Sequence, residues 1–259
     1  MPITQQLLLN IPTFPLAIMV VGGSIFLTIL TTLFSHYVVP QHKQKIGGAL
    51  TVLIFGTNSI IYAILLAVIL FSAWLGFENA QSNVMKEANC VVELYRSTEA
   101  FLPALKQDTR NLLEAYIHSV LNEEWKTLAK SELNPHTIEI SKMIWQVYSG
   151  YAPKTAAEQV FLQESIRKLY ELRECRAQRL QDSKIGIYPL LWFVLLVGEV
   201  ATVFSFAFFT EHIKSKLLAA FLFGALVGLI FFTILLFDFP FTGQLTVSPD
   251  ALRQVLLYW

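Results

Sequence analysis

The chain has 259 residues, of which 54% are hydrophobic and only 15% are charged, and 20 of them are phenylalanine. Its acidic and basic side chains balance to a formal net charge of zero, whereas a nucleic-acid-binding protein needs a basic face to meet the phosphates. The composition therefore excludes nucleic acid as a partner and indicates a membrane protein.

Four long apolar segments occupy residues 15–34, 49–77, 188–209 and 217–237. A helix rises about 1.5 Å per residue, so about 20 residues cross a hydrocarbon core of about 30 Å. Each segment reaches this length, which predicts four transmembrane helices in two hairpins. The residues before the first segment lack the basic stretch and cleavage site of a signal peptide, so we expect that segment to be retained.

These segments divide the chain into four predicted parts. The first hairpin occupies 1–77, a polar insert 78–187, the second hairpin 188–237, and a tail 238–259. The fold class we predict is an all-α membrane protein with 2+2 transmembrane helices and an extramembrane helical insert of about four helices.

Lysines mark both short loops between the predicted spans, Lys43 and Lys45 in one, Lys214 and Lys216 in the other. The positive-inside rule places such loops in the cytoplasm. The insert and both termini then lie on the outer side. A basic cluster just before the third span favours the opposite orientation, but long translocated regions obey the rule weakly. The cluster consists of Arg173, Arg176, Arg179 and Lys184.

The insert has apolar residues at three- and four-residue steps, which is typical of amphipathic helices. Pro103, Pro135 and Pro153 divide it into segments. Thr155 and Glu158 have the spacing of a capping box and predict the start of the last long helix.

The sequence offers no catalytic constellation. It has no phosphate-binding loop, HExxH or CxxC motif, and its histidines do not pair at metal-ligand spacing, so we expect no enzyme, metal or cofactor. We interpret Glu123 and Glu124 as a solvated helix face. Arg173, Arg176 and Arg179 form either a surface face near lipid headgroups or a cationic collar at a channel mouth.

The two cysteines, Cys90 and Cys175, both lie in the insert. Each stands about 13 residues from a predicted span, Cys90 beyond the second and Cys175 before the third. If both spans continue outward as antiparallel helices, the sulfurs reach a similar height. A disulfide and a pair of buried thiols are both compatible with this placement.

Three polar residues inside the predicted spans are candidates for a pore or another intramembrane site. Glu199 is the one ionisable carboxyl within them, and a charge at mid-membrane costs roughly 2.5–3.5 kcal/mol on insertion scales. It is either part of an ion or proton path or a carboxyl hydrogen-bonded to a neighbouring helix. Asn58 and Tyr62 in the second span are the other pore or intramembrane polar candidates.

Glycines mark points where helices can approach closely. Gly224 and Gly228 form a GxxxG pattern in the fourth span, which indicates packing within the bundle or between subunits. In the tail, Ser248 and Pro249 predict the start of a short helix, which we expect at the membrane interface.

Several ordered pieces resemble the bacterial bestrophin-like domain family over nearly the whole chain. They include Glu87-Ala88-Asn89, Glu124-Trp125, Pro189-Leu190-Leu191-Trp192, Asp238-Phe239-Pro240-Phe241-Thr242-Gly243 and Val247-Ser248-Pro249. The positions that we assign to family motifs are Glu87, Asn89, Trp125, Asp238, Pro240, Phe241 and Gly243.

The resemblance implies a distant relation to bestrophins, which are oligomeric anion channels with four-span subunits. It leads us to expect a homo-oligomeric ion channel in a bacterial inner membrane, with the lipid bilayer and copies of the chain as partners and ions as cargo. No calcium-binding acidic run follows Phe241, so calcium gating is not implied. The alternative is a non-conducting sensor or scaffold whose extracytoplasmic helical domain binds a partner protein.

Overall fold

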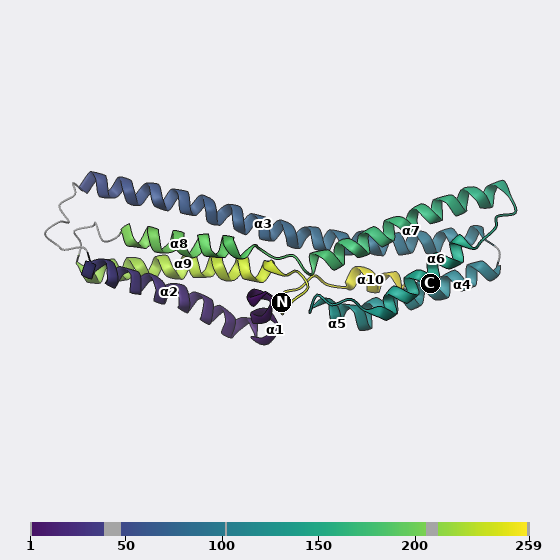
Figure 1. Cartoon of the computed structure of the whole chain (residues 1–259), viewed down its shortest axis with the longest axis horizontal. Coiled ribbons are helices and arrows are strands. Elements are labelled where there is room, and N and C mark those ends of the chain that lie inside the picture. The colour runs from purple at the N-terminus through teal and green to yellow at the C-terminus, as the bar shows by residue number, and fades with distance from the viewer. Residues whose placement is uncertain (1, 39–47, 102, 206–211, 258–259) are drawn as a thin grey trace. The chain divides into compact units, whose positions relative to one another are not determined.

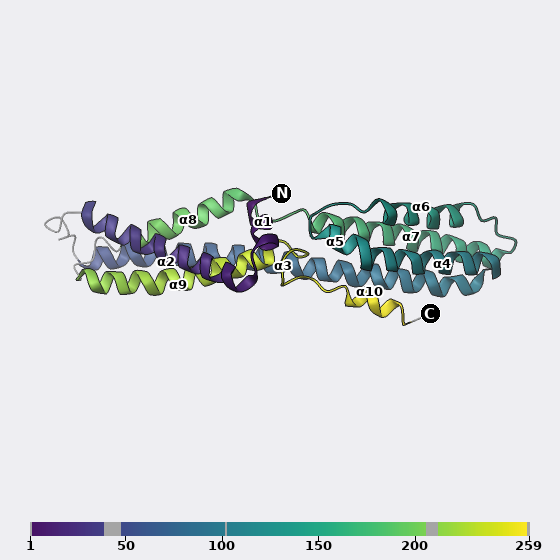
Figure 2. The same cartoon turned by 90° about the horizontal axis from the view of Figure 1, so that it is seen from below.

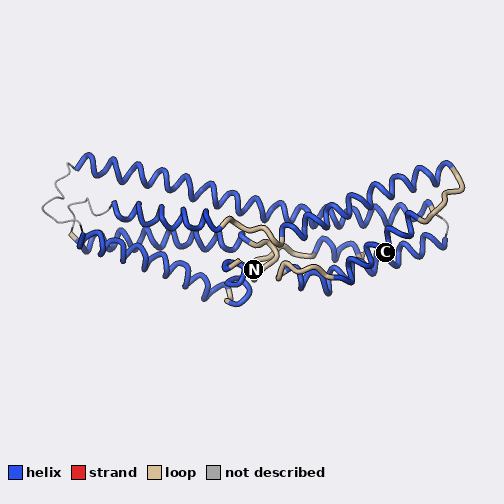
Figure 3. The backbone as a smooth tube through the Cα atoms, in the orientation of Figure 1, coloured by secondary structure: helices blue, strands red, loops and turns tan. Residues whose placement is uncertain are grey.

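The computed structural model describes residues 2–38, 48–101, 103–205 and 212–257. Within these ranges the chain is helical and contains no strand (Figure 3). The helices are α1 Ile3–Asn10, α2 Thr13–Val38, α3 Gly48–Ser97, η2 Thr98–Ala100, α4 Pro103–Ser119, the π-helical turn η3 Val120–Glu124, α5 Trp125–Leu128, α6 Pro135–Ser149, α7 Ala156–Asp182, α8 Pro189–Phe204, α9 Ile213–Asp238 and α10 Asp250–Val255.

Three helical stretches are long and apolar enough to cross a membrane, namely Thr13–Val38, Val52–Ala100 and Ile213–Asp238. They correspond to the first, second and fourth predicted spans. The third prediction, 188–209, coincides with the shorter apolar helix α8, and its end lies outside the described residues. The loop with Lys43 and Lys45 also lies outside them. The all-helical class is therefore confirmed, with three helices of spanning length.

The described chain divides into two compact units. The membrane unit consists of Pro2–Leu75 and Gly186–Asp238, and the insert unit of Gly76–Ile185 and Phe239–Trp259. Helix α3 contributes residues to both units. The tail after Asp238 thus groups with the insert rather than with the membrane helices.

In the membrane unit, α2 packs along α9 and α8 (Figure 1). A Cβ atom on Gly224 would lie 2.9 Å from Ile25 Cα, and one on Gly228 would lie 2.8 Å from Val21 Cα. Residue numbers rise along α9 while they fall along α2, so the two helices are antiparallel. The GxxxG glycines thus permit close helix approach within the chain.

In the insert unit, the ends of helices are set by local side-chain chemistry. Asn134 caps α6 by accepting a hydrogen bond from Thr137 N at 3.1 Å, and Pro135 follows as the first helical residue. Thr155 caps α7 by accepting from Glu158 N at 3.1 Å. The predicted start of this long helix is therefore confirmed.

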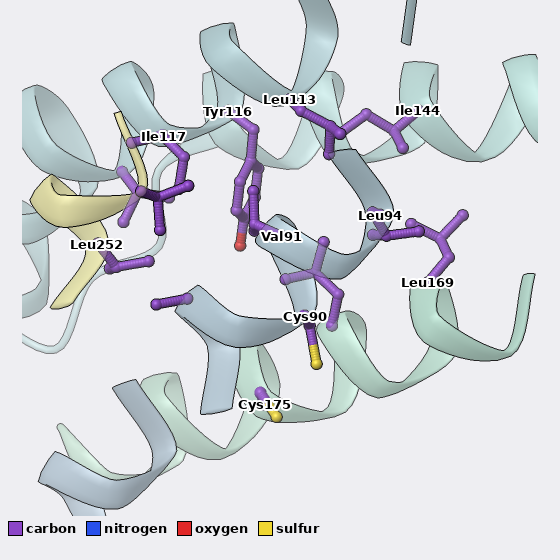
Figure 4. Packing of buried hydrophobic residues seen from close by; sticks show 14 of the residues in the cluster. Cys90, Val91, Leu94, Leu113, Tyr116, Ile117, Ile144, Leu169, Cys175 and Leu252 are labelled. Carbon is purple, nitrogen blue, oxygen red and sulfur yellow. The ribbon is translucent and has the colours of Figure 1, made fainter. Parts of the chain in front are cut away.

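The insert unit has one large apolar cluster, formed by residues of α3, α4, α6, α7 and α10 (Figure 4). Figure 2 shows the ribbons of these helices. Val91 and Leu94 of α3 are fully buried, and so is Leu252 of α10. The tail helix therefore helps to close this core, while Leu257 beyond it is exposed. Its placement at a membrane interface stays a prediction, and Tyr258 and Trp259 lie outside the described residues.

Candidate functional site

The carboxyl of Glu199 is fully buried in the membrane unit. It lies on α8, and Ser24 Oγ of α2 is hydrogen-bonded to its Oε1. The same Ser24 Oγ lies 2.9 Å from the carbonyl oxygen of Gly224 on α9. Glu199 Oε2 has no hydrogen-bond partner among the described residues. One carboxyl, one hydroxyl and one carbonyl thus join three helices.

The proton count at this site constrains the state of Glu199. A serine hydroxyl has one proton to donate, whereas an ionised carboxylate and a carbonyl both only accept. The contacts of Ser24 with Glu199 and with Gly224 are satisfied together when Glu199 carries a proton and donates it to Ser24. Ser24 then donates to Gly224. The arrangement therefore suits a protonated carboxyl.

Tyr62 of α3 meets the same stretch of α8. Its hydroxyl donates to the carbonyl oxygen of Leu195 at 3.0 Å, and its ring lies against Gly198, where a Cβ atom would be 2.6 Å from Tyr62 Cδ2. The structure thus places Tyr62 against the part of α8 that carries Glu199. Asn58, one turn earlier on α3, is only partly buried.

A row of buried hydroxyls extends from Ser24 along α2. Thr28, Thr32 and Ser35 donate to carbonyl oxygens of their own helix at 2.8–2.9 Å. Such bonds satisfy the hydroxyl protons without a partner helix, so these side chains can be buried at low cost. Lys216 of α9 is also buried, two turns before Gly224. The interior of the membrane unit is therefore polar well beyond Glu199.

The insert unit contains a second buried polar cluster, which holds full charges. Arg179 Nε of α7 lies 2.6 Å from Glu87 Oε2 of α3, and Arg179 Nη2 lies 2.6 Å from Glu124 Oε1 of η3. Arg176 Nε donates to Glu124 at 3.2 Å, and the Tyr116 hydroxyl donates to Glu87 at 2.6 Å. The charges of two acids and two bases therefore cancel inside the unit. We call these four side chains, together with Tyr116, the ion cluster.

The π-helical turn η3 accounts for the inward position of Glu124. A π turn holds one more residue than an α turn, so it rotates the residues that follow relative to those before it. Both ends of this turn, Val120 and Glu124, are buried. The next residue is Trp125, and the Cζ atom of Arg179 lies over its ring, 5.6 Å from the ring centroid.

Charge pairing outweighs burial in the ion cluster. Burial acts to raise the pKa of Glu124, but the hydrogen bond from Arg176 and the charge of Arg179 hold that pKa below its usual range. Burial likewise acts to lower the pKa of Arg179, and the charge of Glu87 raises it instead. Burial, aided by the charge of Glu87, raises the pKa of Tyr116 well above its usual range, so Tyr116 remains a donor.

The ion cluster corrects two sequence interpretations. Glu124 is fully buried and does not lie on a solvated face. Arg179 is also fully buried, and the side chain of Arg176 is only 12% exposed, so neither is a surface group. Glu123 does face outward, with His136 at 3.0 Å. A signal was present in the pattern of α7, whose buried residues follow one helical stripe: Leu162, Ser165, Leu169, Leu172, Cys175 and Arg179.

The two cysteines are free, buried thiols. They lie side by side, Cys90 on α3 and Cys175 on α7 (Figure 4). Among the described residues, no group of three or more His, Cys, Asp or Glu side chains could hold a metal ion.

A model of the Bestrophin-like domain matches residues 22–252, which is most of the chain and spans both units. The chain belongs to the bestrophin-like family. Neither a curated protein nor a solved structure matches the chain. The bestrophin-like assignment thus rests on the family match, and it supports a membrane protein together with the three spanning helices.

The predicted bestrophin-like motif positions fall at structurally distinct points. Glu87 belongs to the ion cluster, and the ring of Trp125 lies against its Arg179. Phe241 lies edge-on to Trp125, with 5.6 Å between the ring centroids. Asn89 lines a groove between α3 and α7. The remaining three positions lie where α9 ends and the tail begins.

Those three positions shape the chain after α9. Asp238 Oδ1 accepts a hydrogen bond from Ile187 N at 2.5 Å within the membrane unit. The carbonyl oxygen of Pro240 accepts from Val247 N at 2.8 Å. Gly243 has φ of 96°, a left-handed conformation that favours glycine. These residues thus set the turn that leads into the tail.

Proposed function

We propose that this bestrophin-like protein is a subunit of a homo-oligomeric ion channel in a bacterial inner membrane. One observation carries the proposal: polar side chains remain at the surface of α3 within the membrane unit. Thr57 is exposed and Asn58 partly so, and Gly56 has open space where a side chain would stand. An amide facing hydrocarbon without a hydrogen-bond partner costs several kcal/mol, so this face requires a neighbouring subunit or water.

An assembly around this face of α3 satisfies the requirement. Copies of the chain that place Thr57 and Asn58 toward a common axis give a ring of hydroxyl and amide donors at one level. Such donors replace part of the hydration shell of an anion, and Gly56 leaves room for the ion beside the backbone. Anions are the favoured cargo because the family name relates the chain to anion channels.

Glu199 has an internal role in this proposal. It is fully buried among α2, α8 and α9 within a single chain, so it does not contact the permeating ion. A protonated Glu199 adds no charge at the point where α2, α8 and α9 meet. The sequence left two alternatives for Glu199, an ion or proton path and a hydrogen bond to a neighbouring helix, and this proposal adopts the second.

The test is reconstitution of the purified full-length protein in liposomes, with chloride flux and oligomeric mass measured on the same preparation. We expect an oligomer that conducts, and we expect Asn58→Leu to change the flux by several-fold. Ile61→Leu is the matched control, because Ile61 is an exposed apolar residue of the same helix. A monomer whose liposomes leak no faster than empty ones would contradict the proposal and favour the non-conducting scaffold.

The proposed orientation has its own test. We propose that the insert and both termini are extracytoplasmic, on the basis of the lysines in the two short loops. A reporter that is active only in the cytoplasm, fused after Trp259, is expected to be silent. An active fusion would reverse the orientation without affecting the channel proposal.

A further inference from the structure

The groove between α3 and α7 in the insert unit is distinct from the ion cluster and from Glu199. It has a volume of about 360 Å³ and is lined by Cys90 and Cys175 together with charged side chains. The two cysteines are 7% and 8% exposed, so each presents a small part of its surface. Both cysteines therefore present part of their surface to the groove.

The two thiols are in contact with each other across the helices. The Cys90 and Cys175 side chains interact with each other, and Figure 4 shows their two sulfurs close together, Cys90 on α3 and Cys175 on α7. They are the only cysteines in the chain. Two apposed thiols at an accessible surface are the geometry that thiol–disulfide exchange requires.

An ion pair beside the thiols holds the two helices in register. Lys168 Nζ of α7 lies 2.5 Å from Glu93 Oε2 of α3 and 2.9 Å from Glu171 Oε2 of its own helix. Both Lys168 and Glu93 line the same groove. The pair thus ties α3 to α7 within about one helical turn of Cys90.

Burial makes each thiol slow to react alone. It raises the pKa of Cys90 to about 12 and also raises the pKa of Cys175. Such a thiol is almost entirely protonated at pH 7. The first attack on an oxidant is therefore slow, and its rate rises with pH. The second step is faster because the second thiol is already next to the mixed disulfide.

We propose that Cys90 and Cys175 are a reversible oxidative modification site, at which a small disulfide entering the groove converts the two thiols into a disulfide that links α3 to α7. The inference is independent of the proposed function, because it requires neither conduction nor assembly. The molecule that enters the groove and oxidises the thiols is a low-molecular-weight disulfide.

The reaction balances in two exchange steps. The thiolate of one cysteine attacks a sulfur of the small disulfide, forms a mixed disulfide and releases one thiolate, which takes up a proton. The second cysteine, after losing its proton, attacks the protein sulfur of the mixed disulfide and releases the other small thiol. The two cysteines lose two electrons and two protons, and the small disulfide becomes two thiols.

The experiment uses the reduced full-length protein and 2-hydroxyethyl disulfide as the probe. After acid quenching and denaturation, free thiols are alkylated and the intact mass is measured. We expect a product about 2 Da lighter than the reduced chain that takes up no alkylating reagent and is restored by a reducing agent. Its rate of formation is expected to rise about tenfold per pH unit between pH 7 and 9, because the thiolate fraction does.

Two variants keep the result specific. Cys175→Ser is expected to yield only a mixed disulfide on Cys90. The matched control combines Cys175→Ser with Arg173→Cys, which moves the thiol two residues, or about 200°, around α7 to an exposed position. This control is expected to form at least tenfold less internal disulfide.

Three results would overturn the proposal. The first is wild-type protein that keeps both thiols alkylatable at pH 9 under excess probe. The second is a product consisting only of mixed disulfides or of linked chains. The third is equal cross-linking in the Arg173→Cys control, since that would show that position in the groove does not matter.

Discussion

The two units bury acidic side chains in different ways. In the membrane unit, Glu199 contacts the neutral hydroxyl of Ser24, and no cation contacts it among the described residues. In the insert unit, Glu87 and Glu124 share the guanidinium of Arg179, and Arg176 completes the balance. The first arrangement needs a proton on the carboxyl, and the second needs a counter-charge. Replacing the carboxyl by a neutral amide should therefore cost little stability in the membrane unit and much more in the insert unit.

The largest effect is expected from Arg179→Met. The variant leaves Glu87 and Glu124 buried without their shared guanidinium, and breaking a buried pair from one side costs about 3–5 kcal/mol. Denaturant unfolding of the insert unit, followed by near-UV circular dichroism, measures the loss. Arg173→Met on the exposed side of α7 is the control and should change stability by less than about 0.5 kcal/mol. A loss below about 1 kcal/mol at Arg179 would mean that the ion cluster does not hold the unit together.

Acid should weaken the insert unit through Glu124. The pKa of Glu124 is below its ordinary value of 4.5 in the folded protein, so its contribution to stability is fully present above that value. The contribution is lost as the pH falls through the folded pKa. We expect a stability plateau from pH 5 to 8 and a decline below about pH 4.5, with a shallower decline in Glu124→Gln. If stability declined equally steeply at low pH in the variant and the wild type, other carboxyls would be responsible for the decline.

Gly224→Ala tests the packing of the membrane unit. The added Cβ would lie 2.9 Å from Ile25 Cα and overlap the Thr28 hydroxyl, so α2 and α9 must separate. Overpacking of this kind costs about 1–3 kcal/mol. Gly23→Ala is the matched control, because a Cβ there meets nothing within 4 Å in the single chain. Thermal stability in detergent should fall for Gly224→Ala alone; an equal fall for both variants would place Gly23 against a second subunit.

Ser24→Ala should have a smaller effect than these three substitutions. It removes the hydrogen-bond partner of a neutral buried carboxyl, which costs about 1 kcal/mol, the lower end of the range for a neutral group. Thermal unfolding in detergent at pH 6 measures it, with Ser205→Ala, a buried serine bonded to its own helix, as the control. A loss above about 3 kcal/mol would indicate an ionised Glu199 instead.

The sequence predicted the membrane helices better than the polar contacts. Apolar length alone identified α2, α9 and the first part of α3, and capping chemistry located the start of α7 at Thr155. These features depend on neighbouring residues. The third span was less clear, because the apolar helix α8 covers only 16 residues of the described chain.

The contacts that define the candidate sites join residues far apart in the chain. Ser24 and Glu199 are separated by 175 positions, and Arg179 and Glu87 by 92. No local pattern marks such pairs. Glu124 was misassigned for a different reason, since the π turn η3 shifts the helical register that a regular period of 3.6 assumes.

A direct comparison of two carboxyl-to-amide substitutions tests whether the units differ as described. Glu199→Gln keeps a neutral hydrogen-bonding group where the carboxyl is protonated, so we expect a loss of less than about 1 kcal/mol at pH 7. Glu87→Gln removes a charge that Arg179 and Tyr116 both contact, so we expect a loss of about 3–5 kcal/mol. Denaturant unfolding of both variants at pH 7 gives the answer, and equal losses, or a larger loss at Glu199, would contradict the account.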